Sequence, residues 1–145
     1  MAFSLVMDLL PIEELRLLLD FGLLILIWMV QLIIYPSFLH TDINEFKRWH
    51  YRYTGLISLF VVPLMFGQTA LYVVLSYATN RWAEYTNLSL IGLVWLATFT
   101  LSVPCHDKMQ SLGFDQTVIR RLISTNWVRT AAWTLVFGID VFVVL

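Results

Sequence analysis

Four long apolar stretches constrain the fold of this chain more than any other feature. They cover residues 17–35, 55–75, 88–103 and 127–145. A helix crosses a hydrocarbon core about 30 Å thick with about 20 mostly apolar residues, which is close to the length of each stretch. Because 59% of the 145 residues are hydrophobic and 13% are charged, the chain has more apolar surface than a water-soluble domain of this size can bury. The sequence therefore predicts one all-α domain over residues 1–145, an integral membrane four-helix antiparallel bundle with up-down topology.

Proline positions predict the limits of the first helix. The segment AFSLVMDLL before Pro11 is apolar but too short to cross a membrane, so we expect it to lie on the outer membrane face. Pro11 suits a first helical position, and Pro36 is not tolerated inside a helix without strain. The first helix is therefore expected from Pro11 to about Pro36. Within it, Asp20 is expected to reach water or a neighbouring helix, and Gln31 is expected to hydrogen-bond to another helix.

Helices two and four are predicted to extend beyond the membrane into the cytoplasm. Thr41 or Asp42 suits an N-cap, and a helix from Asp42 to about Ser76 would be about 50 Å long at 1.5 Å per residue. Pro63 predicts a kink in this helix. Gly113 predicts a break in the chain, followed by an N-cap at Asp115 from which the fourth helix runs.

Basic residues predict the orientation of the bundle. Seven of them fall in or beside the first and third connections, and two fall at the opposite end. Because basic residues concentrate on the cytoplasmic side, residues 36–54 and 104–126 are expected in the cytoplasm and both termini outside. Asp140, near the outer end of the fourth helix, is expected to contact water. The seven residues are Lys47, Arg48, Arg52, Lys108, Arg120, Arg121 and Arg129, and the two are Arg16 and Arg81.

Charge, cysteine and histidine content limit the partners and cofactors. A net charge of -1 implies no nucleic-acid partner, and the apolar stretches make the lipid bilayer the expected partner. The single cysteine, Cys105, cannot form an internal disulfide and has no second thiolate with which to bind a metal ion. His40, His50 and His106 are weak candidates for a metal or haem site, because their spacing matches no compact ligand motif. No stretch shows a clean GxxxG face, so a homo-oligomer or a larger complex stays an open alternative.

Polar side chains gather at the predicted cytoplasmic end of the bundle. His50 and Thr54 lie one turn apart on the second helix, and Asn126 and Arg129 lie close together on the fourth. In an up-down bundle these two helices can face each other, so we expect His50, Asn126 and Arg129 to surround one cavity. The loops that carry His40 and His106 are expected to close it from above. The candidate ligand-binding residues are His50, Asn126, Arg129, His106, His40, Thr54 and Gln68.

Other interpretations of these residues stay open. Trp, Tyr, Lys and Arg are enriched at membrane interfaces, so Arg129 and aromatic residues such as Trp127 also fit a plain membrane anchor. Gln68 lies five residues after Pro63. Its amide is expected either to hydrogen-bond to another helix or to line the cavity where the kink frees a backbone carbonyl.

Three segments of the chain resemble a known family. They are YPSFLHTDINEFKRWHYRYTG, VVPLMFG and VPCHDKMQSLGFDQTVIRRLISTNWVRTAAW, and the resemblance covers most of the chain from Tyr35 to Trp133. These segments are similar to small four-span bacterial membrane proteins of unknown function related to the anthrone-oxygenase-like family. The most specific positions are Pro104, His106, Gly113, Phe114, Asp115, Asn126, Trp127, Arg129 and Thr130.

The resemblance implies a protein of the bacterial inner membrane, and the bacterial relatives mostly lack an assigned reaction. The fungal members of the family oxidise polycyclic anthrones with molecular oxygen, and no defined cofactor signature accompanies them. By position, the resemblance points to His50, His106, Asn126 and Arg129 as the matching polar residues. The family often has an acid after the proline-containing stretch of the second helix, where this chain has Gln68. An amide cannot accept a proton, so proton transfer at that position is not expected.

Three classes of function are compatible with these patterns. The first is binding of a hydrophobic small molecule or cofactor, including use as an oxygen-dependent redox enzyme. In that class His50 is a hydrogen-bond partner or base, Arg129 holds an oxyanion and Asn126 orients the substrate. The second is an auxiliary or structural subunit of a larger membrane complex, in which 6 Trp, 10 Phe and 6 Tyr pack against partners. The third is a transporter, which a lone four-helix bundle suits least because it leaves little room for alternating access.

Overall fold

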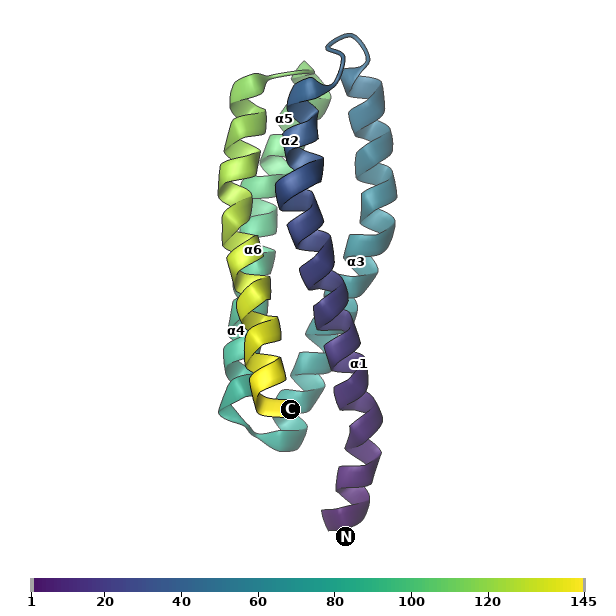
Figure 1. The fold of residues 1–145 in the computed structure, drawn as a ribbon, viewed down its shortest axis with the longest axis vertical. Helices are drawn as coiled ribbons and strands as arrows, with labels where there is room; N and C mark the ends of the chain where they lie inside the picture. Colours follow the sequence, from purple (N-terminus) through teal and green to yellow (C-terminus); the bar gives the residue numbers. More distant parts are fainter. Residues whose placement is uncertain (1, 145) are drawn as a thin grey trace.

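Helices account for almost all of the computed structural model, which describes the backbone of residues 2–144 and the side chains of residues 11–143. Helical residues make up 92% of the structure, and the described part contains no strand. The prediction of an all-α protein is therefore confirmed. The helices of the described part form four rods. These rods run along the long axis of the molecule (Figure 1).

The first rod is a continuous helix that is longer than the sequence predicts. It passes through Pro11 and Pro36, so the predicted start and end are both wrong. The segment before Pro11 continues the helix instead of lying apart from it. A proline removes one backbone hydrogen bond, and the bonds on either side can still hold the helix. The parts of this rod are α1 (Ala2–Met29), η1 (Val30–Ile34), α2 (Tyr35–Ser37) and η2 (Phe38–His40).

Two π-helical segments allow the rods to continue through proline. The Tyr35 N–H donates to the Val30 carbonyl, five residues earlier, so the turn ahead of Pro36 is wider than an α-turn. A proline ring in a regular α-helix clashes with the carbonyl four residues before it, and the wider turn relieves that contact. The third rod repeats this arrangement, because a π segment lies just ahead of Pro104. The parts of the third rod are α4 (Trp82–Ala97), η3 (Thr98–Ser102) and α5 (Val103–Leu112).

The second rod is a single helix, α3 (Phe46–Thr79), of 34 residues. At 1.5 Å per residue it is about 51 Å long, which agrees with the predicted length. Its predicted start at Asp42 is wrong. The Asp42 carboxylate instead caps the short turn at residues 43–45 that lies just before the helix, because its Oδ1 accepts a hydrogen bond from the Asn44 backbone N–H at 2.8 Å. The helix continues without interruption through Pro63.

The fourth rod, α6 (Gln116–Val144), begins where the sequence predicts. Asp115 Oδ1 accepts hydrogen bonds from the backbone N–H groups of Thr117 and Val118 at 2.8 and 3.1 Å, which is an N-cap. Gly113 separates α6 from α5 with a φ of 94°, a region that glycine occupies without strain. The predicted break and the predicted cap are both confirmed.

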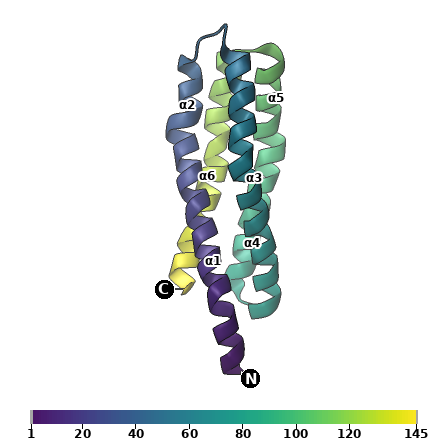
Figure 2. The same ribbon diagram turned by 90° about the vertical axis from the view of Figure 1, so that its right-hand side faces the viewer.

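The four rods alternate in direction. In Figures 1 and 2 the chain ascends through α1 and α2, descends through α3, ascends through α4 and α5, and descends through α6, so both termini lie at one end. Helix α1 contacts α3 and α6, and α4 contacts the same two helices. Helices α3 and α6 therefore lie diagonally opposite each other.

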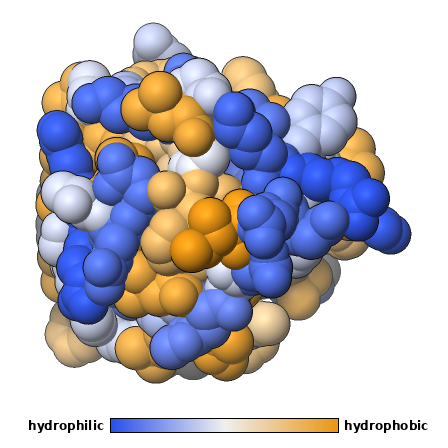
Figure 3. Space-filling view, turned by 90° about the horizontal axis from the view of Figure 1, so that it is seen from above, coloured by the Kyte–Doolittle hydropathy of each residue, from blue (hydrophilic) through white to orange (hydrophobic). Residues whose placement is uncertain are grey.

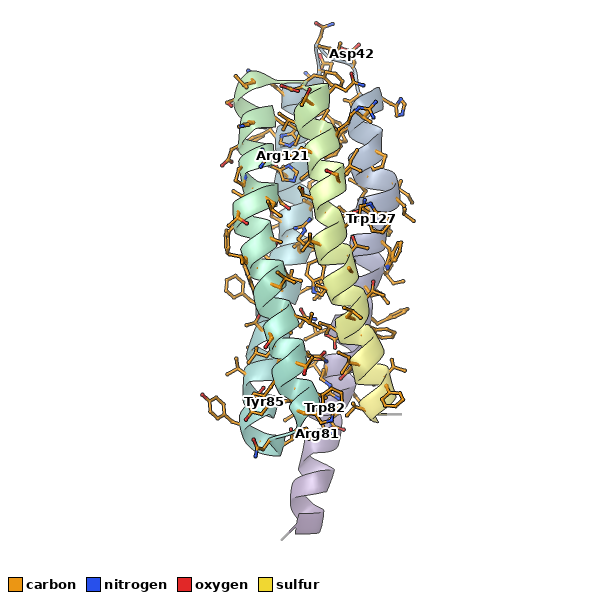
Figure 4. The ribbon with its side chains drawn as sticks, turned by 90° about the vertical axis from the view of Figure 1, so that its left-hand side faces the viewer. Asp42, Arg81, Trp82, Tyr85, Arg121 and Trp127 are labelled. Carbon is orange, nitrogen blue, oxygen red and sulfur yellow. The ribbon has the colours of Figure 1, made fainter. Side chains whose placement is uncertain are left out.

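The two ends of the molecule carry different residues. The loop end, which we define by residues 41–45 and 113–115, shows hydrophilic side chains around smaller hydrophobic patches (Figure 3). Figure 4 places Asp42 and Arg121 toward this end, and Arg81, Trp82 and Tyr85 toward the end that holds the termini. The loop end and the terminal end therefore present side chains from different parts of the chain.

Three helical segments are long and apolar enough to cross a membrane, judged by length and composition. They are Pro11–His40, Phe46–Thr79 and Trp82–Leu112. Over its described residues α6 is not among them, and its charged residues are Arg120, Arg121, Arg129 and Asp140. The fourth predicted span, residues 127–145, stays a prediction that depends on where these charges face.

Candidate functional site

A cavity of about 380 Å³ lies among the four rods, between the middle of the molecule and the loop end. Each rod contributes side chains to its wall. A cavity of this size falls in the range of about 300–1,000 Å³ that is typical of small-molecule sites. The wall is mostly apolar and includes Val30, Ile57, Val61, Met65, Trp95 and Trp133.

The cavity opens sideways between α3 and the third rod. Some of its lining residues are also exposed on the outer surface, among them Phe66 and Phe99 with exposed fractions of 60% and 61%. On each side these residues are spaced four apart, so they form one stripe along each helix. We call these two stripes the mouth, which consists of Ser58, Val62 and Phe66 on α3 and Phe99, Val103 and Asp107 on η3 and α5.

Arg129 on α6 forms the polar end of the cavity. Its side chain is 6% exposed and donates from Nε and Nη2 to Asn126 Oδ1 at 2.9 and 2.5 Å. It also donates from Nη2 to Tyr35 Oη at 3.1 Å and from Nη1 to Thr98 Oγ1 at 3.3 Å. These partners are all neutral, and no acid among the described residues forms an ion pair with Arg129, Asp107 at the mouth included. A buried guanidinium without a counter-charge leaves the cavity suited to negative charge.

A chain of hydrogen bonds leads from the cavity wall toward the loop end. Tyr35 Oη lies 3.2 Å from His106 Nε2, and His106 Nδ1 lies 2.9 Å from His50 Nε2. His50 Nδ1 in turn lies 3.0 Å from Oε1 of the half-buried Gln110. Tyr35 and His106 line the cavity, so the chain connects its interior with the surface of α5.

Aromatic rings hold His50 in this chain. The Phe46 ring stacks on the His50 ring at an interplanar angle of 15°, with 5.6 Å between the ring centroids. Phe38 approaches His50 edge-on at 5.9 Å. Both phenylalanines are fully buried, so they shield His50 from water on these two sides. Its ring is therefore fixed by packing as well as by hydrogen bonds.

Asn126 is held in place by the first rod. Its Nδ2 donates to Gln31 Oε1 at 2.8 Å, and Gln31 Nε2 donates to the Ile123 carbonyl at 3.1 Å. Thr130 Oγ1 donates to the same Gln31 oxygen at 3.3 Å. The prediction that Gln31 bonds to another helix is confirmed. Because Nδ2 of Asn126 is fixed toward Gln31, its Oδ1 is fixed toward Arg129.

The structure brings most of the sequence-predicted site residues together. His106, Arg129 and Thr54 line the cavity. His50 and Asn126 do not line it, but each hydrogen-bonds to a residue that does. His106 lies within α5 and not in a closing loop, so its ring forms part of the wall instead of a cover.

Two predicted residues lie elsewhere. His40 is exposed at the end of η2 and takes no part in the cavity wall. Gln68 is buried and does not line the cavity, because its Nε2 donates to Asp20 Oδ1 at 2.6 Å and its Oε1 accepts from Trp133 Nε1 at 3.1 Å. The helix-to-helix alternative for Gln68 is thus the one that the structure shows. The expectation that Asp20 reaches water or a neighbouring helix is met by the second option.

Sequence reasoning missed the two tyrosines of the cavity, Tyr35 and Tyr53. Tyr35 follows Gln31 by four residues, so both fall on one helix face, and this spacing is a signal that could have found it. Tyr53 lines the cavity beside Thr54, and no hydrogen bond within the described part of the chain involves its hydroxyl group. That hydroxyl is available to a ligand.

No metal centre is evident among the described residues. In that part of the chain no three His, Cys, Asp or Glu side chains gather closely enough to hold a metal ion. The ring nitrogens of His50 and His106 face each other in a hydrogen bond, and His40 is exposed.

A second buried network lies at the terminal end of the molecule. Arg16 on α1 donates to Glu84 on α4, and its Nε lies 2.7 Å from Asp140 Oδ1 on α6 in an ion pair. Arg81 joins Glu84 to Glu13 at the rim, with N–O distances of 2.7 Å to each. All three core members, Arg16, Glu84 and Asp140, are at most 1% exposed. The expectation that Asp140 contacts water is therefore wrong, because Arg16 from another helix reaches it inside the protein.

Comparisons with known proteins identify no relative of this chain. No protein-family model, curated protein or solved structure matches it. A function for the chain is therefore inferred from the geometry of its cavity.

Proposed function

We propose that this chain is an integral membrane protein that binds a hydrophobic small molecule carrying an anionic or strongly polarised oxygen group. The observation that carries the proposal is Arg129, a buried guanidinium on the cavity wall whose hydrogen-bond partners are all neutral. Burial of a charge costs on the order of several kcal/mol unless an opposite charge or strong hydrogen bonds compensate it. An oxygen of the ligand supplies that compensation.

The remainder of the cavity supports a hydrophobic ligand body. Its wall is formed by apolar side chains such as Val61, Met65 and Trp95. Burial of apolar ligand surface contributes roughly 25 cal/mol per Å². An apolar body next to one charged end is the arrangement that fits an amphiphilic molecule.

Burial of the α6 charges supports insertion of all four rods in the membrane. Arg129 and Asp140 are 6% and 1% exposed, so they face the protein interior. The outward face of α6 carries apolar side chains instead, including Leu135 and Phe142 with exposed fractions of 54% and 86%. Ionisable residues in membrane helices are tolerated when they face the interior of the bundle. Helix α6 is therefore proposed as the fourth span.

The basic residues support an orientation with the loop end in the cytoplasm. Six of the nine Lys and Arg residues lie toward the loop end, two lie near the terminal end, and the buried Arg129 lies between them, in the middle of α6. This asymmetry matches the positive-inside rule. The polar end of the cavity then lies toward the inner leaflet of a bacterial inner membrane, with both termini on the outer side.

The mouth supports entry of the ligand from the lipid. Its two stripes are on the outward faces of α3 and of η3 with α5, along the sides of the rods and not at the loop end. In the membrane this position faces the hydrocarbon region. A ligand that dissolves in lipid reaches the cavity there without crossing water.

Oxidation of a hydrophobic substrate by molecular oxygen is the reaction that the family resemblance adds to this site. In such a reaction Arg129 stabilises an oxyanion of the substrate. Tyr35 and His106 lie next to Arg129 on the wall, and they transfer the proton that the substrate releases. Binding is the primary proposal, and the oxidation is its extension.

Native mass spectrometry of the purified protein tests the proposal. We expect the wild-type protein, extracted in a mild detergent, to carry a hydrophobic small molecule or to take up 1-naphthol added as a probe. Ser58→Trp places a large ring at the mouth and is expected to abolish both. Leu59→Trp is the matched control, because Leu59 is 69% exposed and lies outside the cavity wall.

Two outcomes of this experiment oppose the proposal. A wild-type protein that is free of small molecules and does not take up 1-naphthol has no such site. A foreign protein bound in stoichiometric amount, with no small molecule, favours the auxiliary-subunit alternative instead.

A further inference from the structure

The hydrogen bonds of Tyr35, His106, His50 and Gln110 can all have the same direction. Gln110 Oε1 is a carbonyl oxygen and only accepts, so His50 Nδ1 must carry a proton. In the neutral ring His50 Nε2 is then an acceptor, and the donor to it is His106 Nδ1 at 2.9 Å. His106 Nε2 is in turn left as an acceptor for the Tyr35 hydroxyl at 3.2 Å. Each group in the chain thus donates to the next, from the cavity to the loop end.

Tyr35 has room for one more partner inside the cavity. A phenolic oxygen donates one hydrogen bond and accepts up to two. Tyr35 Oη donates to His106 and accepts from Arg129 Nη2 at 3.1 Å, so one lone pair is unused among the described contacts. A hydroxyl group of a ligand beside Arg129 fits this lone pair.

We propose that Tyr35, His106 and His50 form a proton relay that ionises a weakly acidic hydroxyl group of the ligand within the cavity. This inference rests on the proposed function and narrows the ligand to a hydrophobic phenol or enol. Such a molecule is neutral in lipid and becomes an anion only next to Arg129. The negative counter-charge that Arg129 lacks is therefore generated inside the cavity.

The proton balance of the relay is complete. The ligand O–H bond breaks and its proton joins Tyr35 Oη, while the Tyr35 proton passes to His106 Nε2. His106 releases its Nδ1 proton to His50 Nε2, which makes His50 an imidazolium. His50 then releases its Nδ1 proton to water beside Gln110, and each group regains a neutral form after the rings exchange tautomers. The ligand keeps the electron pair of the broken bond as an oxyanion held by Arg129.

The surroundings of the relay favour this route over direct contact with water. His50 is 1% exposed between Phe38 and Phe46, and Tyr35 is 4% exposed. The other ionisable groups that face the relay are Tyr53, whose ring centroid is 6.5 Å from that of His106, and Arg129. No carboxylate is hydrogen-bonded to either histidine among the described residues. Apart from Asp107 at the mouth, which is hydrogen-bonded to neither histidine, a proton that leaves the cavity has the histidines as its acceptors among the described lining residues.

Binding of 1-naphthol and of its methyl ether, 1-methoxynaphthalene, tests the relay at equilibrium. Naphthol and naphtholate differ in absorption, so the spectrum reports ionisation separately from binding. We expect naphthol to bind as naphtholate at a pH where it is neutral in detergent alone, and the ether to bind more weakly without a spectral shift. If neither probe binds, the proposed function fails. If both bind equally and no naphtholate forms, the binding site stands and the relay is wrong.

The rate of naphtholate formation tests the route. In stopped-flow mixing, His50→Phe is expected to slow naphtholate formation by about a hundredfold, the typical size of a general acid-base contribution, while the final fraction bound stays unchanged. His40→Phe is the matched control, since His40 is exposed and outside the relay. An unchanged rate in His50→Phe overturns the relay.

The direction of the relay is testable without a ligand and without a substitution. Nitrogen-15 NMR of the histidine-labelled wild-type protein distinguishes the two neutral tautomers of each ring. We expect His50 and His106 both to carry the proton on Nδ1, and the exposed His40 to show the mixture typical of a solvated ring. A proton on Nε2 of His50 in the ligand-free protein reverses the chain and overturns the inference.

Discussion

Arg16 Nη1 donates hydrogen bonds to both carboxylate oxygens of Glu84 at 2.9 Å, and this contact joins two helices through residues that are 68 positions apart in the sequence. The same guanidinium reaches Asp140 through Nε at 2.7 Å. One arginine therefore ties α1 to α4 and to α6 inside the protein. Buried charges of this kind are costly when one member is removed, because its partners stay behind without compensation.

Replacement of Arg16 by methionine is expected to destabilise the protein by about 3–5 kcal/mol, the usual cost of breaking a buried ion pair. Glu84 and Asp140 would be left as buried carboxylates. Arg48→Met is the control, because the Arg48–Glu45 pair is exposed and such pairs contribute about 0–1 kcal/mol. Denaturant titration of both variants in detergent measures the difference, and equal stabilities would contradict the structural role of Arg16.

Asn126→Asp is expected to weaken ligand binding without unfolding the protein. The new carboxylate lies where Asn126 Oδ1 now accepts from Arg129 at 2.5 and 2.9 Å, so it supplies the missing counter-charge from within the chain. Loss of one strong charge interaction corresponds to about 1.5–3 kcal/mol, or at least a tenfold rise in Kd for a bound naphtholate. Titration with 1-naphthol checks this. Affinity equal to that of the wild type would mean that Arg129 does not hold the ligand.

Gly113→Ala is expected to destabilise the protein by about 1–2 kcal/mol, because alanine is strained at positive φ. Gly113 has a φ of 94°, and an added Cβ would lie 3.4 Å from Lys47 Cε. Gly92→Ala is the matched substitution within a helix. No atom lies within 4 Å of a Cβ at that position, so we expect stabilisation by about 0.5–1 kcal/mol. Thermal unfolding of both variants decides the signs, and a stable Gly113→Ala would show that the turn can reorganise.

Cysteine labelling tests the proposed orientation. His40 and Asn80 are exposed at opposite ends of the molecule, and the native Cys105 is buried and is removed as Cys105→Ala. A membrane-impermeant maleimide is expected to label Asn80→Cys from the outer side of the inner membrane. His40→Cys should react only after the membrane is broken. The reverse pattern would place the loop end outside and would move the polar end of the cavity to the outer leaflet.

Local signals in the sequence predicted the elements that depend on local contacts. Gly113 and Asp115 ended one helix and capped the next as predicted, because a turn and an N-cap involve only residues within a few positions. Pro36 misled the prediction of where the first helix ends. A proline normally indicates the end of a helix. Nothing in the sequence indicates that a π turn ahead of the proline relieves the clash between its ring and the carbonyl four residues earlier.

The site was predicted in part for a similar reason. Arg129 and His106 stand out as polar residues near apolar stretches, so their position at one end of the bundle could be inferred. Tyr35 did not stand out, since a tyrosine near a helix end fits a membrane interface equally well. The burial of Asp140 depends on Arg16, which lies on a different helix near the other end of the sequence. Such a pairing is set by helix packing and leaves no trace in local spacing.

The sideways mouth has a consequence for what the protein can recognise. Its exposed rim of Val62, Phe66, Phe99 and Val103 leaves an open path between the cavity and the space beside the helices. A long alkyl tail can remain outside among the lipid chains while only the head of the molecule enters. The protein then does not distinguish ligands by the length of the tail. Compounds compete according to their head-group chemistry and to how strongly they partition into the bilayer, whatever their solubility in water.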